Sequence, residues 1–178
     1  MIQHFPFFAR LKRKVGAFCI GFFVFFQVLN AETGIEIKKD LVYATKDNLE
    51  LKLDAYLPAG SKLRPSVLVI HGGGWRFGSK RQLAKYASGL AGRGFNAFAI
   101  NYRLAPQHKH PAQIEDCRDA VRWIKKNSGR YGGDPDRIGA LGYSAGAHLA
   151  CMLAVTGQEK AGNEIGTKIL VAVGGGTP

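Results

Sequence analysis

A cluster of glycines follows an apolar run in VLVIHGGGWRFGSK, residues 67–80. Read from Gly73, the letters give G-x-x-x-x-G-S-K, whereas a phosphate-binding loop needs G-x-x-x-x-G-K-[ST], with lysine before the hydroxyl residue. Because the last two residues are reversed here, the pattern argues against a phosphate site. It leaves open which other developing negative charge the backbone N–H groups of this loop would stabilise.

A serine stands at a second glycine-containing motif, in RIGALGYSAGAHLA, residues 137–150. Gly142, Ser144 and Gly146 fit G-x-S-x-G, after an expected strand and at the start of an expected helix, which is the context that this motif requires. A sharp strand-to-helix turn would strain the serine backbone and expose its hydroxyl, and the glycines would remove side chains that collide there. The helix N-terminus adds positive potential where an oxyanion forms. Ser144 is therefore a candidate nucleophile.

The two motifs together favour acyl-transfer chemistry. The glycine loop would offer unobstructed backbone N–H groups to a substrate oxygen, joined by the N–H of Ala145, and so hold a tetrahedral oxyanion rather than a phosphate. A tight structural turn and a nucleotide-binding loop are the alternatives for the glycines alone.

Four ordered blocks carry a resemblance to a known family over about residues 49–173. The chain resembles the hormone-sensitive-lipase-like α/β-hydrolases, and more closely their small bacterial esterase members, which are related to acyl-sugar esterases. The resemblance implies a carboxylic-ester hydrolase for small-molecule esters with short acyl groups, with no metal and no cofactor. The blocks are HGGGWRFGSK, NYRLAP, HPAQIEDCRDAVRWI and GGDPDRIGALGYSAGAHLA.

The same resemblance assigns roles to single residues. It makes Ser144 the nucleophile and gives the oxyanion-hole donors as Gly73, Gly74 and Ala145. Gly72 shapes the loop, and His71 opens it in a structural role.

The remaining histidines and acids in these blocks receive weaker interpretations. His148 lies one helical turn after the serine, and helix geometry is expected to point it away from the serine hydroxyl. His108 and His110 are expected near the rim of a pocket. Asp116 and Asp119 lie on an expected helix, where a charged face or a structural hydrogen bond is the favoured interpretation.

The catalytic acid and base are missing from the expected places. In this fold the triad order is Ser, then Asp or Glu, then His. After Ser144 the chain has no aspartate, its glutamates Glu159 and Glu164 come too early, and its one histidine is His148. The chain is thus expected to be the front part of a hydrolase, without the last strands and inactive or very weak. A non-catalytic ligand-binding remnant and a peptidase or amidase of the same fold are the alternatives.

The elements that would position these motifs alternate between strands and helices. The pattern predicts an antiparallel hairpin followed by short buried strands of a mostly parallel sheet with helices on both faces, an α/β fold. The last apolar run, KILVAV, would lie at an exposed sheet edge and promote self-association. The expected strands are 35–45, 49–57 (half-buried), 66–70, 95–100, 137–141 and 168–173; the expected helices are 83–90 (with Ser79 as N-cap and one buried face formed by Leu83, Tyr86, Ala87 and Leu90), 114–124 and 145–155.

Length, composition and charge predict a folded domain and give no sign of nucleic-acid binding. The chain has 178 residues, of which 46% are apolar, so it can bury a core. The net charge is +12, but the basic residues form no stripe interleaved with aromatics, and no nucleic-acid partner is expected. A disulfide between Cys117 and Cys151 is conceivable, but two buried free thiols are favoured.

The N-terminus looks like a targeting segment. Four basic residues at positions 10–14 precede the apolar run 15–29, which is short for a membrane span of about 20 residues. Residues 1–31 are therefore expected to be a signal peptide and residues 32–178 a partial α/β-hydrolase domain, exported to the periplasm or secreted. An uncleaved N-terminal membrane anchor is the alternative.

Expression of the chain with its own N-terminus in a bacterium is expected to give a product shortened near Ala31. The basic start and apolar run are the features that a signal peptidase substrate needs. Mass spectrometry of the exported fraction would measure the new N-terminus. Full-length chain in the soluble cytosol would contradict the expectation.

Overall fold

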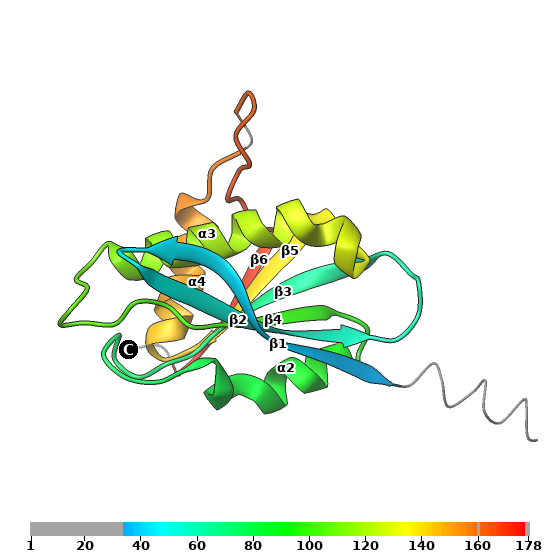
Figure 1. Cartoon of the computed structure of the whole chain (residues 1–178), viewed down its shortest axis with the longest axis horizontal. Helices are drawn as coiled ribbons and strands as arrows, with labels where there is room; N and C mark the ends of the chain where they lie inside the picture. The colour runs from blue at the N-terminus through cyan, green and yellow to red at the C-terminus, as the bar shows by residue number, and fades with distance from the viewer. Residues whose placement is uncertain (1–33, 160, 177–178) are drawn as a thin grey trace, which may run out of the picture. The chain divides into compact units, whose positions relative to one another are not determined.

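One mixed sheet runs through the part of the chain that the computed structural model describes, residues 34–159 and 161–176. Its order is β1-β2-β4-β3-β5-β6 (Figure 1). The expected signal peptide, residues 1–31, lies outside the described residues. The strands are β1 (Ile35–Lys46), β2 (Leu49–Pro58), β3 (Arg64–Ile70), β4 (Asn96–Ile100), β5 (Gly133–Tyr143) and β6 (Val171–Gly175).

The sheet has an antiparallel and a parallel part. β1 and β2 form the expected hairpin, which turns at Asp47 and Asn48, both with positive φ. β2 also pairs antiparallel with β4, whereas β4, β3, β5 and β6 are parallel neighbours. Because the carboxyl ends of parallel strands share one edge, the loops after β3, β4 and β5 gather there.

Helices cover both faces of the sheet, so the predicted α/β class is confirmed. Figure 1 shows α2 on one face and α3 and α4 on the other. The α3 stripe of Ile114, Cys117, Val121 and Ile124 is buried as predicted. The helical segments are η1 (Lys80–Leu83), α2 (Ala84–Ala91), α3 (Ala112–Asn127), η2 (Ser128–Tyr131) and α4 (Ala145–Thr156).

The expected buried face of the first helix is partly wrong. A 3₁₀ turn occupies residues 80–83, so α2 begins only at Ala84 and its phase differs from that of one continuous helix. Leu83 and Ala87 are buried, but Tyr86 is 61% exposed. Ser79 stands at the N-cap position of the 3₁₀ turn and makes no side-chain capping hydrogen bond.

The prediction that β2 is half-buried is also wrong. Asp54 and Tyr56 on one face are buried, as are Leu53 and Ala55 on the other. The alternation of polar and apolar letters misleads here because β2 lies between β1 and β4, and because η1 and α2 cover the face that carries the polar side chains.

The structure tests the expectation of two buried free thiols. Both cysteines of the described residues are free: Cys117 is buried as expected, but Cys151 is exposed on α4 rather than buried. No helix in the described ranges has the length and apolar character needed to cross a membrane.

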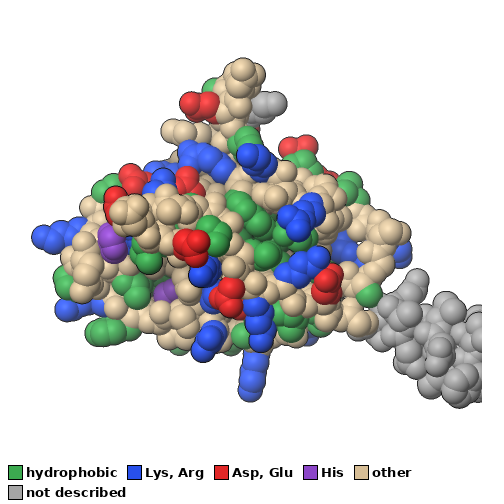
Figure 2. All heavy atoms as spheres, viewed as in Figure 1, with side chains coloured by type: hydrophobic (Ala, Val, Ile, Leu, Met, Phe, Trp, Pro, Cys, Tyr) green, Lys and Arg blue, Asp and Glu red, His purple; other side chains and the backbone are tan. Residues whose placement is uncertain are grey.

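On the face shown in Figure 2, Lys and Arg side chains lie interspersed with Asp and Glu. That nucleic acid is not a partner stays a prediction.

The last described strand differs from the fully covered strand that its sequence suggested. β6 begins at Val171 rather than Lys168, and the side chains of Val171 and Val173 are 56% and 54% exposed. Within the described residues, β6 has a strand partner on one side only, β5. Self-association through this edge stays a prediction.

We expect residues 32–178 to form oligomers in solution, because exposed apolar strand edges promote association. Replacing Val171 and Val173 together by threonine should shift the chain toward monomers in analytical ultracentrifugation. Val155→Thr is the matched control, since Val155 is 81% exposed but lies on α4. A monodisperse monomer without any substitution would contradict the prediction.

Candidate active site

Ser144 occupies the sharp turn between β5 and α4 that its motif predicted. Its φ of 52° and ψ of −122° place a non-glycine residue in a strained conformation. The turn is held by its own backbone, since the Ser144 N–H donates to Gly175 O (2.8 Å) and Ser144 O accepts the N–H groups of Ala147 (2.8 Å) and His148 (3.1 Å). The backbone of this turn thus fixes the serine where the strand ends and the helix begins.

Glycine is required on both sides of the serine. A Cβ at Gly142 would lie 2.1 Å from the carbonyl oxygen of Gly146, and a Cβ at Gly146 would lie 2.1 Å from that of Ile70. Both distances are far below van der Waals contact, and the atoms met are backbone atoms that cannot rotate away. The predicted steric role of these two glycines is confirmed.

The glycine loop after β3 lies against the serine. A Cβ at Gly72 would be 2.8 Å from Tyr143 O and 3.3 Å from Ser144 Cβ. Gly73 has a φ of +109°, and its carbonyl oxygen accepts the N–H groups of Arg76 (3.1 Å) and Phe77 (3.0 Å), which closes the loop into a turn. Close backbone approach and left-handed φ values therefore explain the run of glycines.

Three backbone N–H groups, two in the glycine loop and one at the start of α4, lack a hydrogen-bond partner in the described part of the chain. Within residues 34–159 and 161–176, no hydrogen bond is donated by the N–H of Gly73, Gly74 or Ala145. Ala145 is the first residue of α4, where N–H groups have no partner within the helix and the helix dipole is positive. This agrees with the oxyanion role expected for these residues, which stays a prediction.

His71 is buried beside the glycine loop and contacts its backbone. It is 1% exposed, its Nδ1 donates to Gly72 O (2.7 Å), and its ring stacks on Tyr102 with centroids 4.3 Å apart. Burial lowers the pKa of His71, so the imidazole is neutral at pH 7. The Tyr102 hydroxyl donates to His71 O (3.0 Å). These contacts agree with a structural role.

The exit of the loop is anchored by Lys80, a role that sequence reasoning missed. Its Nζ bonds Asp40 Oδ1 (2.8 Å) and Asp54 Oδ1, and its backbone N–H donates to Asn101 Oδ1 (2.8 Å). The lysine that follows Gly78 and Ser79 is thus 6% exposed within an ion-pair cluster. The order Ser79-Lys80 was the only feature of the sequence that drew attention to this lysine. Its ion pairs could not be predicted, because only the fold brings β1 and β2 beside it.

A second ion pair orders the segment after β4. Asp116 on α3 is fully buried and accepts from Arg103 Nη2 (2.7 Å), Nε (3.0 Å) and the Arg103 backbone N–H (2.8 Å). Asp119 pairs with Lys46 (2.8 Å) and Arg122 (2.9 Å). The structural interpretation of both aspartates is confirmed.

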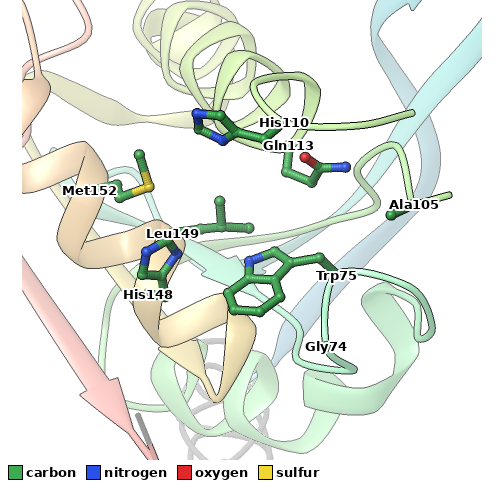
Figure 3. Close-up of a pocket in the computed structure, with 8 residues that line it drawn as sticks. All are labelled: Gly74, Trp75, Ala105, His110, Gln113, His148, Leu149 and Met152. Carbon is green, nitrogen blue, oxygen red and sulfur yellow. The ribbon is translucent and has the colours of Figure 1, made fainter. Parts of the chain in front are cut away.

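Two cavities are lined in part by the glycine loop. One, of about 440 Å³, includes the serine and is lined by Gly72, Gly73, Gln82, Leu83, Tyr86, Tyr143 and Ser144. The other, of about 310 Å³, is lined by Gly74, Trp75, Ala105, His110, Gln113, His148, Leu149 and Met152 (Figure 3).

The histidines take different places around these cavities. His110 and His148 line the smaller one, and the His148 ring meets the Trp75 ring edge-on, with centroids 5.3 Å apart. His108 contributes its carbonyl oxygen to the Gln113 amide (2.7 Å). Among the described residues, no histidine is hydrogen-bonded to Ser144 Oγ, and no cluster of three metal-ligating side chains occurs.

One family model and several known proteins match the sequence of this chain. The BD-FAE family model matches residues 53–171. The probable carboxylic ester hydrolase LipM of Mycobacterium tuberculosis is 43% identical over 93 residues, which are 52% of this chain and 22% of that protein. The probable isoprenylcysteine α-carbonyl methylesterase ICME of Oryza sativa subsp. japonica is 32% identical over 149 residues, which are 82% of this chain and 34% of that protein.

Solved structures give the same result for the fold. Esterase 2 of Thermogutta terrifontis, phosphoramylated by tabun, superposes with a TM-score of 0.70 at 32% identity, covering 82% of this chain and 57% of that one. Its butyrate-bound form superposes with a TM-score of 0.69 at 34% identity, covering 79% and 52%. The chain therefore has an α/β-hydrolase fold and spans less than two thirds of the length of these relatives.

Two glycine-to-alanine substitutions should separate the steric requirement at the turn from helix propensity. Gly146→Ala is expected to lower the free energy of unfolding by about 3 kcal/mol or more, because its Cβ would overlap the Ile70 carbonyl. Gly89→Ala, in α2, meets only the Arg93 guanidinium at 3.4 Å. It should raise the free energy of unfolding by up to about 1 kcal/mol. Urea unfolding measures both, and equal effects would contradict the steric account.

Proposed function

Because the chain belongs to the BD-FAE family of α/β-hydrolase esterases, we propose that it is a serine carboxylic-ester hydrolase whose nucleophile is Ser144. One observation carries the proposal. Ser144 is held in a strained turn at the start of α4, with its Cβ directly beside the glycine loop that follows β3. A serine held this way has no evident structural purpose, whereas acyl transfer needs a hydroxyl beside unpaired N–H donors.

The chemistry proceeds through an acyl-enzyme. Ser144 Oγ attacks the ester carbonyl carbon and gives its proton to a base, while the carbonyl oxygen becomes an oxyanion that accepts hydrogen bonds from the N–H groups of Gly73, Gly74 and Ala145. Collapse of this intermediate breaks the bond to the alkoxy oxygen, which leaves as the alcohol with that proton. Water then attacks the acyl-serine, releases the carboxylic acid and restores the hydroxyl.

Short acyl groups are the proposed substrate class. The related Thermogutta esterase 2 is solved with butyrate and with propionate bound. The cavities beside the glycine loop here, of about 310 and 440 Å³, lie at the lower end of the range for small-molecule sites. Esters of short acids, including acylated sugars, fit this size. We further propose that the activity is located outside the cytoplasm, as the basic and apolar N-terminus favours.

A second candidate function has its own support. Within the described residues, the Ser144 hydroxyl has no hydrogen bond to a histidine, and a serine hydroxyl is a poor nucleophile without a base. A non-catalytic binding protein that keeps the pocket would look the same in this part of the chain. The two candidates differ in whether Ser144 reacts as a nucleophile.

The 178-residue chain, purified from a host without related esterases, is expected to hydrolyse 4-nitrophenyl butyrate slowly. In a well-studied serine protease, loss of the base leaves roughly 10³ to 10⁴-fold catalysis over water from the oxyanion hole and binding. Because this residual rate does not depend on the serine, Ser144→Ala should lower it little, and the control Ser88→Ala, on α2, should leave it unchanged.

Two outcomes would be informative. Absence of phosphorylated Ser144 after incubation with paraoxon would exclude it as the nucleophile and favour the binding protein. Turnover of many per second that is lost on Ser144→Ala would show that a base is present, and His148 and His110 would be the first positions to mutate. Incubation with paraoxon, followed by peptide mass spectrometry, reports modification of Ser144 without the need for turnover.

A further inference from the structure

The smaller cavity lies beside the reacting position without including it. Gly73 lines the cavity that contains Ser144, and the next residue, Gly74, lines the smaller one. If the proposed function holds, the ester carbonyl is bound at the N–H groups of these two consecutive residues. The two arms of the ester, acyl and alkoxy, then diverge from the border between the cavities.

Trp75 forms one wall of the smaller cavity, and its backbone conformation is strained. Its φ of 59° is left-handed, which is unusual for a bulky residue. The conformation is held by the Ala105 N–H, which donates to Trp75 O (2.9 Å), and by the edge-on contact of the indole with His148. The strained backbone thus presents the indole to α4 rather than to solvent, and an observed outlier of this kind points to a functional placement.

The other walls set the size and polarity of the cavity. In Figure 3, Trp75 and His148 lie on one side and His110 on the opposite side, with Met152 toward one end and Leu149 between them. The volume of about 310 Å³ equals roughly ten water molecules in the liquid. Among the described lining residues there is no Asp, Glu, Lys or Arg. An uncharged, apolar group of a few carbon atoms therefore suits this space.

We propose that this cavity, with Trp75 as its wall and Met152 as its end, is the specificity pocket that receives a short apolar arm of the ester. Met152 is half-buried one turn beyond His148 on α4, where its flexible thioether closes the pocket. Its length then sets how many carbon atoms the arm can have. Trp75 and Met152 are thus specificity-determining residues of the proposed esterase.

Binding of the separated arms tests this without requiring turnover. The chain has two tryptophans, and in a Trp123→Phe background Trp75 is the only indole. Its emission would be followed while butanoate, hexanoate and octanoate, and then the alcohols of the same lengths, are added to the full chain. Saturation-transfer NMR on the unsubstituted chain replaces fluorescence if Trp123→Phe does not fold, since Trp123 stacks on Tyr131 in the core.

Butanoate or 1-butanol should bind saturably, and octanoate and 1-octanol should bind more weakly. Met152→Ala should favour hexanoate over butanoate by about 16-fold relative to the unsubstituted chain, since hexanoate has two more methylenes and each buried methylene is worth about fourfold in affinity. Val155→Ala, on the exposed side of the same helix, should leave the preference unchanged. Tighter binding of the acids assigns the pocket to the acyl arm and tighter binding of the alcohols to the alkoxy arm; both support the proposal.

Three results would overturn it: no saturable binding of any member of either series, an equal loss for all chain lengths in Met152→Ala, or the same shift in Val155→Ala. Ser144 does not line this cavity, so Ser144→Ala should leave the titrations unchanged while it removes modification by paraoxon. Failure of the pocket and failure of the proposed esterase activity therefore give different results.

Discussion

The first turn of α4 lies directly on the carboxyl end of β3, and the arrangement of the site depends on this backbone contact. The missing side chain of Gly146 leaves its Cα facing the carbonyl oxygens of Ile70 and His71. The contact brings the start of the glycine loop, at Gly72, against Ser144. The parallel pairing of Ile70 with Gly142 fixes the same alignment from within the sheet. Ser144 and the backbone of the glycine loop are therefore positioned by main-chain packing, which is more rigid than contact between side chains.

Buried charges then hold the segments that leave the sheet. Lys80, paired with Asp54, anchors the chain after the glycine loop, and Arg103, paired with Asp116, anchors the chain after β4. A buried ion pair adds little net stability because both charges lose water, but it tolerates few alternative geometries. These pairs thus hold the segments after β3 and β4 in one geometry, and in the proposed esterase this would be the preorganisation on which electrostatic catalysis depends. The ordered segment after β4 also carries Ala105, whose N–H supports Trp75.

The sequence was informative where a requirement is local and chemical. G-x-S-x-G predicts the turn at Ser144, because only one backbone path suits those glycines, and the apolar runs predict the parallel strands. Patterns failed where burial depends on packing between elements: the polar side chain of Asp54 on β2 is bonded by Lys80 of η1, and Tyr86 faces solvent because the buried residues of α2 are Ala87 and Ala91. The cavity around Trp75 and Met152 could not be predicted, since it joins three segments whose spacing in the chain has no periodic signal.

The parallel pairing of β3 with β5 has a consequence for how the chain acquires its site during synthesis. The glycine loop leaves the ribosome about 70 residues before Ser144, which at 5–20 residues per second is an interval of roughly 4 to 14 s. Throughout it, β3 has an apolar edge with no β5 to pair with, and non-local parallel pairing is slow to form. The strain at Ser144 can be imposed only after that pairing exists. Ser144 is therefore expected to reach its strained turn late in folding, after β3 and β5 have paired.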